Sequence, residues 1–237
     1  MRVFVIGASS DIGLAVCRYY LSEGWDVLAH YRTMRPELAE LAEQNSGAVE
    51  LLRIDFADTA NLERILAKFK DQYLACDSMI NCVATLNPLK FSDITANNIL
   101  EHFSVNTLPG LLLMRDMVPA MAKRGWGRIV HLGSIGVKFG GGKESFGYSL
   151  SKHALEFLPS DYKDWASKGV LVNVLRVGVT NTRLHGSDPS KNMINRIRLI
   201  PMQRMASADE VAKAVGFFGS DINSYITGQV ISVSGGE

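Results

Sequence analysis

Short apolar runs rich in β-branched residues alternate with segments of helical periodicity along most of the chain. Because parallel strands need long crossover connections, helices between strands favour right-handed βαβ units. The strand runs are apolar throughout, as expected when helices cover both faces of a sheet. The pattern predicts a doubly wound α/β domain with a seven-stranded, mainly parallel sheet and helices on both faces. The predicted strands cover 2–7, 25–32, 49–56, 77–84, 127–134, 170–178 and 228–236, and the helices 12–24, 36–47, 59–73, 93–123, 148–168 and 207–219.

Composition fits one such domain over residues 1–237 and narrows the partners. The chain has 237 residues, 47% of them hydrophobic, which suffices for a sizeable core. A net charge of +1 argues against nucleic acid as the main partner. No apolar run reaches the roughly 18 residues of a membrane span, and the strand pattern at the start leaves no room for a signal peptide. The cysteines, Cys17, Cys76 and Cys82, lie in apolar runs typical of buried thiols, so we expect a cytoplasmic protein without a membrane partner.

The turn after the first strand, "GASSDIG" (7–13), predicts a phosphate site. Gly7 suits a tight turn, Gly13 suits close packing of the helix on the sheet, and free N–H groups at a helix start attract phosphate. An acid, Asp11, stands where glycine would let the backbone approach a pyrophosphate. A carboxylate at a helix start can cap free N–H groups, so a nucleotide still fits if Asp11 turns toward the helix; the direction of its side chain stays open. A purely structural turn is the alternative that this stretch alone leaves open.

The stretch "YSLSK" (148–152) carries the candidate acid–base chemistry. Tyr148 and Lys152 are four positions apart, which places them on one face of a helix. A nearby ammonium lowers the pKa of a tyrosine, so Tyr148 is suited to donate a proton to a carbonyl oxygen or to take one from an alcohol. Ser134 ends a predicted strand, where its hydroxyl is placed to bind a substrate carbonyl. For an isolated pair, an exposed Tyr and Lys on a helix surface is the plainer interpretation.

A hydride would have to come from a nicotinamide, because no side chain supplies one. The end of the second predicted strand reads "LAHYRT". Tyr31 stands where an NAD-type acid would bind the ribose, and the next residue, Arg32, suits the 2′-phosphate of NADP. These two residues favour NADP(H) over NAD(H), with a solvent-facing arginine as the alternative.

The motifs follow one another in an order that resembles the classical short-chain dehydrogenase/reductase family over essentially the whole chain. After the glycine turn come "NCVA" (81–84), "FSVNT" (103–107), Ser134, "YSLSK", "RVGVTNT" (176–182) and "YITGQVISVSGG" (225–236). The chain departs from the family pattern at Asp11, at Val177 in place of proline, and by one extra residue between Ser134 and Tyr148. That residue falls in a glycine-rich stretch, where an insertion costs little.

The resemblance implies an oxidoreductase that transfers a hydride between NADP(H) and a ketone, an aldehyde or the corresponding alcohol. It further implies a homodimer or homotetramer built on the helices after the fourth and fifth strands. The alternative is a non-catalytic dinucleotide-binding sensor or partner subunit. An isomerase or dehydratase on the same fold is a third and weaker option. The implied catalytic residues are Ser134, Tyr148, Lys152 and Asn106, of which Asn106 holds a water. The resemblance implies no metal. The implied cofactor contacts are Gly7, Ser9, Ser10, Asp11, Ile12, Gly13, Tyr31, Arg32, Asp55, Phe56, Asn81, Ala84, Tyr148, Lys152, Gly178, Thr180 and Thr182.

The longest irregular stretch, 179–206, is expected to form a lid over the site. It carries Arg183, Lys191, Arg196 and Arg198. These charges are compatible with an anionic or thioester-linked substrate, and equally with a solvated amphipathic helix, which we favour. The substrate therefore stays open at this point.

Overall fold

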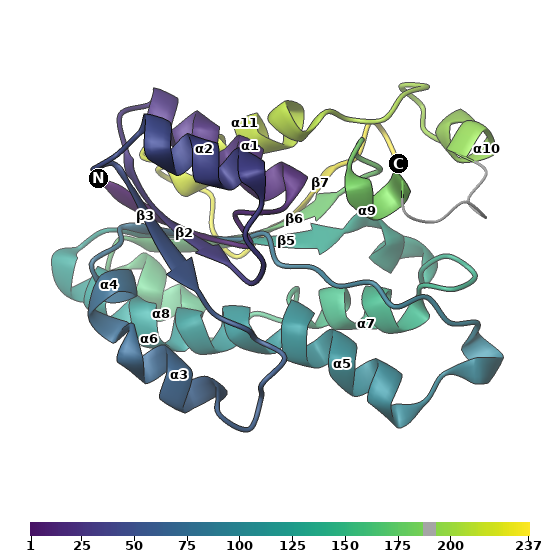
Figure 1. Cartoon of the computed structure of the whole chain (residues 1–237), viewed down its shortest axis with the longest axis horizontal. Helices are drawn as coiled ribbons and strands as arrows, with labels where there is room; N and C mark the ends of the chain where they lie inside the picture. The colour runs from purple at the N-terminus through teal and green to yellow at the C-terminus, as the bar shows by residue number, and fades with distance from the viewer. Residues whose placement is uncertain (187–192) are drawn as a thin grey trace.

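A sheet of seven parallel strands runs through the molecule, in the order β3-β2-β1-β4-β5-β6-β7 (Figure 1). The computed structural model describes residues 1–186 and 193–237. The sheet confirms the predicted doubly wound α/β class. Its strands are β1 (Arg2–Ile6), β2 (Asp26–Tyr31), β3 (Val49–Arg53), β4 (Ser78–Asn81), β5 (Gly127–Ser134), β6 (Val170–Val177) and β7 (Val230–Val233).

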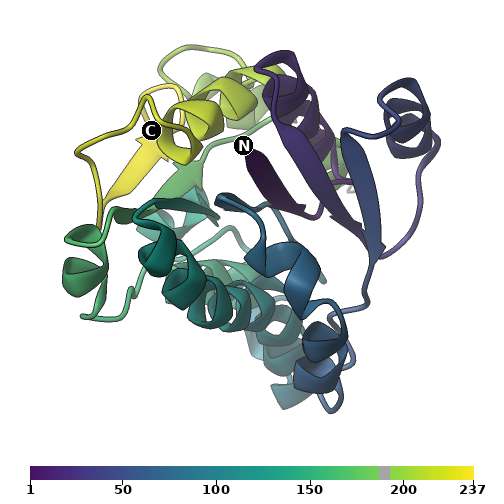
Figure 2. The same cartoon turned by 90° about the vertical axis from the view of Figure 1, so that its left-hand side faces the viewer.

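Helices cover both faces of the sheet (Figures 1 and 2). Successive side chains of β1 point to opposite faces: Val3 and Val5 enter one core, and Phe4 and Ile6 the other. Burial on both faces explains why the strands read as continuous apolar runs. One layer holds α1 (Asp11–Ser22), α2 (Pro36–Gln44) and α11 (Ala208–Gly219), and the other holds α3 (Leu62–Lys68), α4 (Lys70–Leu74), α5 (Ala96–Asn106), α6 (Leu108–Arg124), α7 (Phe146–Ala154) and α8 (Tyr162–Ala166).

Three predicted helices are divided. The stretch predicted over 59–73 forms α3 and α4, which are separated at Phe69. The stretch predicted helical over 148–168 ends as α7 at Ala154 and resumes as α8 at Tyr162, with Pro159 between them. Proline lacks the backbone N–H that a helix needs, and it disfavours a helical conformation in the residue before it. The stretch over 93–123 divides into α5 and α6 at Thr107, whose hydroxyl donates to the Ser151 carbonyl at 2.7 Å.

The predicted lid lies beyond the carboxyl ends of the strands (Figure 1). It contains two short helices, α9 (Arg183–Gly186) and α10 (Met193–Arg198). Lys191 lies outside the described residues. Within the described ranges, no helix is long and apolar enough to cross a membrane. Two short 3-10 turns follow strands along the chain: η1 (Phe91–Asp93) comes after β4, and η2 (Ile135–Phe139) comes directly after β5.

Candidate active site

The turn between β1 and α1 is held by its own serine. Gly7 has φ +84°, a left-handed conformation that glycine adopts without strain. Ser10 donates its hydroxyl to the Gly7 carbonyl at 2.7 Å and accepts from the Gly13 N–H at 3.0 Å, so Ser10 caps α1. A Cβ on Gly13 would lie 2.2 Å from the Gly7 carbonyl oxygen. Gly13 is therefore needed for close approach of helix and turn.

Asp11 does not cap α1, which answers the question that the sequence left open. Its carboxylate turns away from the helix and accepts the Arg183 backbone N–H at 2.8 Å through Oδ2. The Arg183 guanidinium lies 2.5 Å from Oδ1 and extends to Glu37 at 3.2 Å. The physical reason is that Ser10 already fills the cap, which leaves the carboxylate free to pair with the lid cation. Asp11 thus joins the first turn to the start of α9.

His30 on β2 holds the same turn through a hydrogen bond. It was not among the predicted site residues. Its Nδ1 accepts the Gly7 N–H at 3.0 Å, and its Nε2 lies 3.1 Å from the Ile54 carbonyl. A carbonyl only accepts, so Nε2 carries the hydrogen and the imidazole is neutral. Burial lowers the pKa of His30 to about 4. The one available signal was a polar residue inside an otherwise apolar strand.

The residues predicted for the adenosine half lie at the ends of β2 and β3. Tyr31 ends β2, and the exposed Arg32 follows it without an ion pair to any residue the structure describes. Asp55 is exposed and accepts the Ala57 N–H at 3.0 Å. Phe56 is buried and stacks on His30 at 4.2 Å, so its side chain belongs to the core. Only its backbone is left for a cofactor contact.

Asn81 and Asn106 organise the segment after β4. Asn81 is buried and accepts the Val83 N–H at 3.3 Å, while its amide nitrogen lies 3.2 Å from His131 Nδ1. The Asn106 amide donates to the Thr85 carbonyl at 3.0 Å and to Ser151 at 2.9 Å, and its oxygen accepts the Thr85 N–H at 2.6 Å. Both N–H groups of the Asn106 side chain are thus used by protein atoms. These bonds fix the segment that leaves β4, and the water-holding role that the resemblance implies for Asn106 stays a prediction.

Ser134 at the end of β5 and Tyr148 and Lys152 on α7 make up the candidate acid–base group. Ser134 ends β5, and its oxygen accepts the Gly136 N–H at 3.2 Å, which leaves the hydroxyl hydrogen for another acceptor. The Lys152 ammonium donates to the Val83 carbonyl at 2.7 Å and the Leu132 carbonyl at 2.9 Å. Tyr148 and Lys152, which are four positions apart on α7, both line one cavity.

The pKa values of this group differ from the sequence argument. Burial raises the pKa of Tyr148 to about 12, and the interaction with Ser134 opposes that shift only in part. Burial also lowers the pKa of Lys152 to about 8. The expected lowering of the tyrosine pKa is therefore not observed, because desolvation of the phenol dominates and the Lys152 ammonium is directed at two carbonyls.

The stretch after β6 supplies the predicted nicotinamide end. A Cβ on Gly178 would lie 2.6 Å from the Ser234 Cα, so only glycine fits beside the segment that follows β7. Thr180 is buried and donates to the Gly178 carbonyl at 3.1 Å, and Thr182 donates to the Thr180 carbonyl at 3.4 Å. These bonds order the start of the lid.

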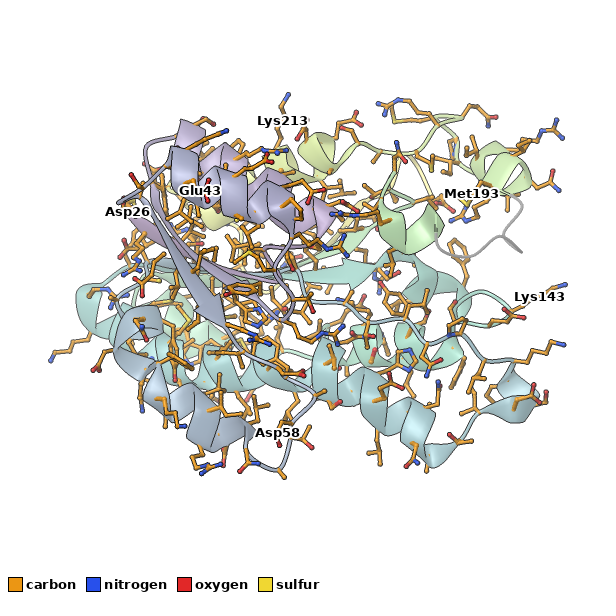
Figure 3. All side chains as sticks on the ribbon, in the orientation of Figure 1. Asp26, Glu43, Asp58, Lys143, Met193 and Lys213 are labelled. Atoms are coloured by element: carbon orange, nitrogen blue, oxygen red, sulfur yellow. The ribbon has the colours of Figure 1, made fainter. Side chains whose placement is uncertain are left out.

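A cavity of about 970 Å³ opens at this edge of the sheet. Figure 3 shows two residues of its wall, Lys143 and Met193, at the end of the molecule beyond the strands. Of the predicted site residues, Ile12, Ala84, Ser134, Tyr148, Lys152, Gly178, Thr180 and Thr182 line it. The others, Gly7, Ser9, Ser10, Asp11, Gly13, Tyr31, Arg32, Asp55, Phe56, Asn81 and Asn106, lie outside its wall.

Two further residues of the wall, Arg196 and Glu237, form an ion pair at 2.6 Å. In the sequence, Arg196 stands out only as one of several lid cations, and Glu237 belongs to none of the motifs. The two come from α10 and from the segment after β7. No local pattern links positions so far apart, so only the fold reveals the pair.

Comparisons with known proteins agree with this geometry. A family model described as enoyl-(acyl carrier protein) reductase matches residues 7–237. The acetoacetyl-CoA reductase of Allochromatium vinosum is 28% identical over 242 residues, which cover 98% of this chain and 96% of that protein. The 3-oxoacyl-[acyl-carrier-protein] reductase FabG of Escherichia coli is 27% identical over 236 residues, covering 98% and 95%. A crystal structure from Beutenbergia cavernae with NADP bound at low occupancy has a TM-score of 0.89 at 28% identity, covering 99% and 95%.

Fold and site together define an oxidoreductase of the dinucleotide-binding α/β class. The chain belongs to the short-chain dehydrogenase/reductase family, through the enoyl-(acyl carrier protein) reductase model that spans nearly all of it. This confirms the resemblance drawn from the order of the motifs.

Proposed function

We propose that the protein is an NADP(H)-dependent enzyme that interconverts a ketone or aldehyde and the corresponding alcohol. One observation carries the proposal: Ser134, Tyr148 and Lys152 line the same cavity as Gly178, Thr180 and Thr182. The same cavity would thus hold a proton donor, a hydroxyl that binds the substrate carbonyl, and the residues predicted to contact the nicotinamide. The NADP-bound relative from Beutenbergia cavernae supports the choice of cofactor.

The residues present fit a dinucleotide. The Gly7–Gly13 turn is too tight for a Cβ on Gly13, and it presents the start of α1 to a phosphate. The negative charge of Asp11 is countered by Arg183, which removes the main objection to binding an anion there. Arg32 has no ion pair with any described residue and is free to meet a 2′-phosphate. Gly7, Ser10, Gly13 and Arg32 would hold the phosphates, and the cofactor would supply a hydride.

Ser134 and Tyr148 would act on the substrate carbonyl. The Ser134 oxygen already accepts the Gly136 N–H, so Ser134 would donate its own hydrogen to a further acceptor such as a carbonyl oxygen. The raised pKa of Tyr148 keeps the phenol protonated at neutral pH. Tyr148 would therefore donate its proton to the oxygen as negative charge develops there, and would take it back in alcohol oxidation.

Lys152 would stabilise the phenolate that Tyr148 becomes. The Val83 and Leu132 carbonyls hold its ammonium in the cavity wall. A cation fixed in a site of low dielectric stabilises a nearby anion more than it would in water. Asn106 would act indirectly. Its side chain holds Thr85, which lies two residues after Val83, and the Val83 carbonyl accepts from Lys152.

Turnover distinguishes this proposal from a non-catalytic sensor and from an isomerase or dehydratase. A panel of ketones and aldehydes is offered with NADPH, and absorbance is followed with wild type and Tyr148→Phe. We expect reduction of part of the panel, a loss of at least about 100-fold in the variant, and unchanged NADPH binding. Tyr225→Phe is the matched control, because Tyr225 is 95% exposed. NADPH binding without consumption would support the sensor, and full activity of Tyr148→Phe would contradict the catalytic assignment.

We further propose a cytoplasmic homodimer or homotetramer. Large apolar side chains are exposed on and beside α5, α6 and α7, at Leu100, Leu108, Leu150 and Phe157. These are the helices that the resemblance assigns to subunit contacts, and burial of such residues favours association. The free, buried cysteines support a reducing compartment. Sedimentation analysis tests the assembly, and a monomer at micromolar concentration would contradict it.

A further inference from the structure

We propose that the cavity selects uncharged carbonyl compounds over those with a free carboxylate, and that Glu237 is the residue that sets this preference. This inference rests on the proposed function and concerns the substrate end of the same cavity. The argument starts from the ion pair between Glu237 and Arg196 in the wall that also holds Tyr148.

The Glu237 carboxylate is buried in that wall. Its side chain is 6% exposed, against 31% for Arg196, and Arg196 Nη2 lies 2.6 Å from Glu237 Oε1. The backbone of Glu237 is fixed as well, because its carbonyl accepts from Lys138 and from Ser234, each at 3.2 Å. A negative charge thus has a defined place in the cavity, balanced by a single guanidinium.

Arg196 is held by Glu237 rather than shared among several acceptors. Its Nη1 is buried and has no hydrogen-bond partner among the residues the structure describes. The one acceptor described for this guanidinium is therefore the Glu237 carboxylate, which balances its charge. Arg183, another lid arginine that could have met an anion, is likewise balanced by carboxylates, because Asp11 and Glu37 hold it outside the cavity wall.

The rest of the substrate end is mainly apolar. Phe139, Met193, Leu199 and Pro201 line the cavity around the pair, and Phe139 and Leu199 expose 62% and 71% of their surfaces. Lys143 is also in the wall but is exposed at the outer end of the molecule (Figure 3). Lys152 is committed to backbone carbonyls beside Tyr148.

A substrate carboxylate entering this space would lose hydration and would meet two cations that already have protein partners, Arg196 and Lys152, with Lys143 only at the outer end. It would also approach the like charge of Glu237 in a site of low dielectric, where such repulsion is strong. An ester, thioester or simple ketone has neither cost and gains contact with the apolar side chains. The geometry thus favours a neutral carbonyl compound.

A matched pair of ketones tests the inference with the full-length protein and NADPH. Methyl 5-oxohexanoate and 5-oxohexanoate share one skeleton and differ in one charge. We expect wild type to prefer the ester in kcat/KM by at least about tenfold. Glu237→Gln releases Arg196 to the substrate, so the preference should fall by about tenfold or more, through a rise in the rate with the acid.

Two further variants keep the test independent of one substitution. Arg196→Gln leaves the Glu237 charge unbalanced, so the preference for the ester should increase. Glu144→Gln is the matched control, because Glu144 also lines the cavity but has no ion pair with Arg196, and its preference should equal that of wild type. Thermal unfolding of each variant confirms that it is folded.

Equal or better use of the acid by wild type would overturn the inference while leaving the proposed function standing. An unchanged preference in folded Glu237→Gln would also overturn it. If no carbonyl compound in the wider panel is reduced, the proposed function itself fails, and this inference fails with it.

Discussion

Asp11 in the first turn receives both the backbone N–H and the guanidinium of Arg183, a residue 172 positions further along the chain. The contact joins the start of α9 to the turn that we propose to hold a pyrophosphate. It also places a cation beside the one acid of that turn. The substitution of aspartate for glycine is therefore coupled to the lid, and the effect of one residue depends on the other.

Loss of the arginine should weaken cofactor binding. In Arg183→Gln the Asp11 carboxylate keeps its charge without its partner, next to the expected position of the cofactor phosphates. We expect the KM for NADPH to rise by about tenfold, with kcat changed by less than about twofold. Initial rates at varied NADPH concentration measure both values.

Two comparisons isolate the Asp11 contact from a general loosening of the lid. Glu37→Gln removes only the 3.2 Å contact of Arg183 and should change the KM less. Asp11→Asn combined with Arg183→Gln removes both charges and should recover much of the affinity. A double variant no better than Arg183→Gln would show that the charge of Asp11 is not the cause.

Much of this fold could be predicted because its sheet is covered on both faces. Each strand needs a continuous apolar run, and each crossover needs a helix, so both leave strong signals. Breaks within helical stretches were harder. Pro159 and Pro109 are local signals near two of the breaks, whereas the division of α3 from α4 at Phe69 has no proline beside it.

The candidate site was predictable where it follows strand ends and not where it depends on distant partners. Ser134, Tyr148 and Lys152 were found from position and spacing, and all three line the cavity. The partner of Asp11, the pair of Arg196 with Glu237, and the bond from Gly7 to His30 join segments that the chain brings together only on folding. Burial also controls the pKa of Tyr148, and spacing alone carries no information on burial.

Lys152 should impose an alkaline limit on carbonyl reduction. Its pKa is lowered to about 8 by burial, whereas that of Tyr148 is raised to about 12, so the lysine loses its proton first as pH rises. Above about pH 8 the developing phenolate loses its cation, and kcat should fall. Lys152→Arg keeps the charge and should move this limit to higher pH at a lower maximal rate. A reduction rate that is flat through this range would contradict the role of Lys152.

Acid should destabilise the protein through two buried histidines. Burial lowers the pKa of both His30 and His131 from 6.5 to about 4, so between these values the unfolded chain binds protons that the folded chain does not. The free energy of unfolding should therefore fall as pH decreases from 6.5 toward 4. His30→Gln should lower the slope of the unfolding free energy against pH, by an amount that corresponds to at most about one bound proton. Urea unfolding at a series of pH values measures it, and an unchanged slope would argue against a neutral, buried His30.

Arg32 should determine the choice between the two nicotinamide cofactors. It is exposed beside the end of β2 and has no ion pair with any residue in the described ranges, so its guanidinium is free to bind a 2′-phosphate in a forked contact. In Arg32→Asp the phosphate meets a carboxylate, while the ribose hydroxyl of NADH gains an acceptor. We expect the ratio of kcat/KM for NADPH over NADH to fall by at least about tenfold. Arg35→Asp makes the same charge change three residues along, at the start of α2, and should shift the ratio far less. Equal shifts in the two variants would mean that general electrostatic attraction, and not a contact at Arg32, sets the preference.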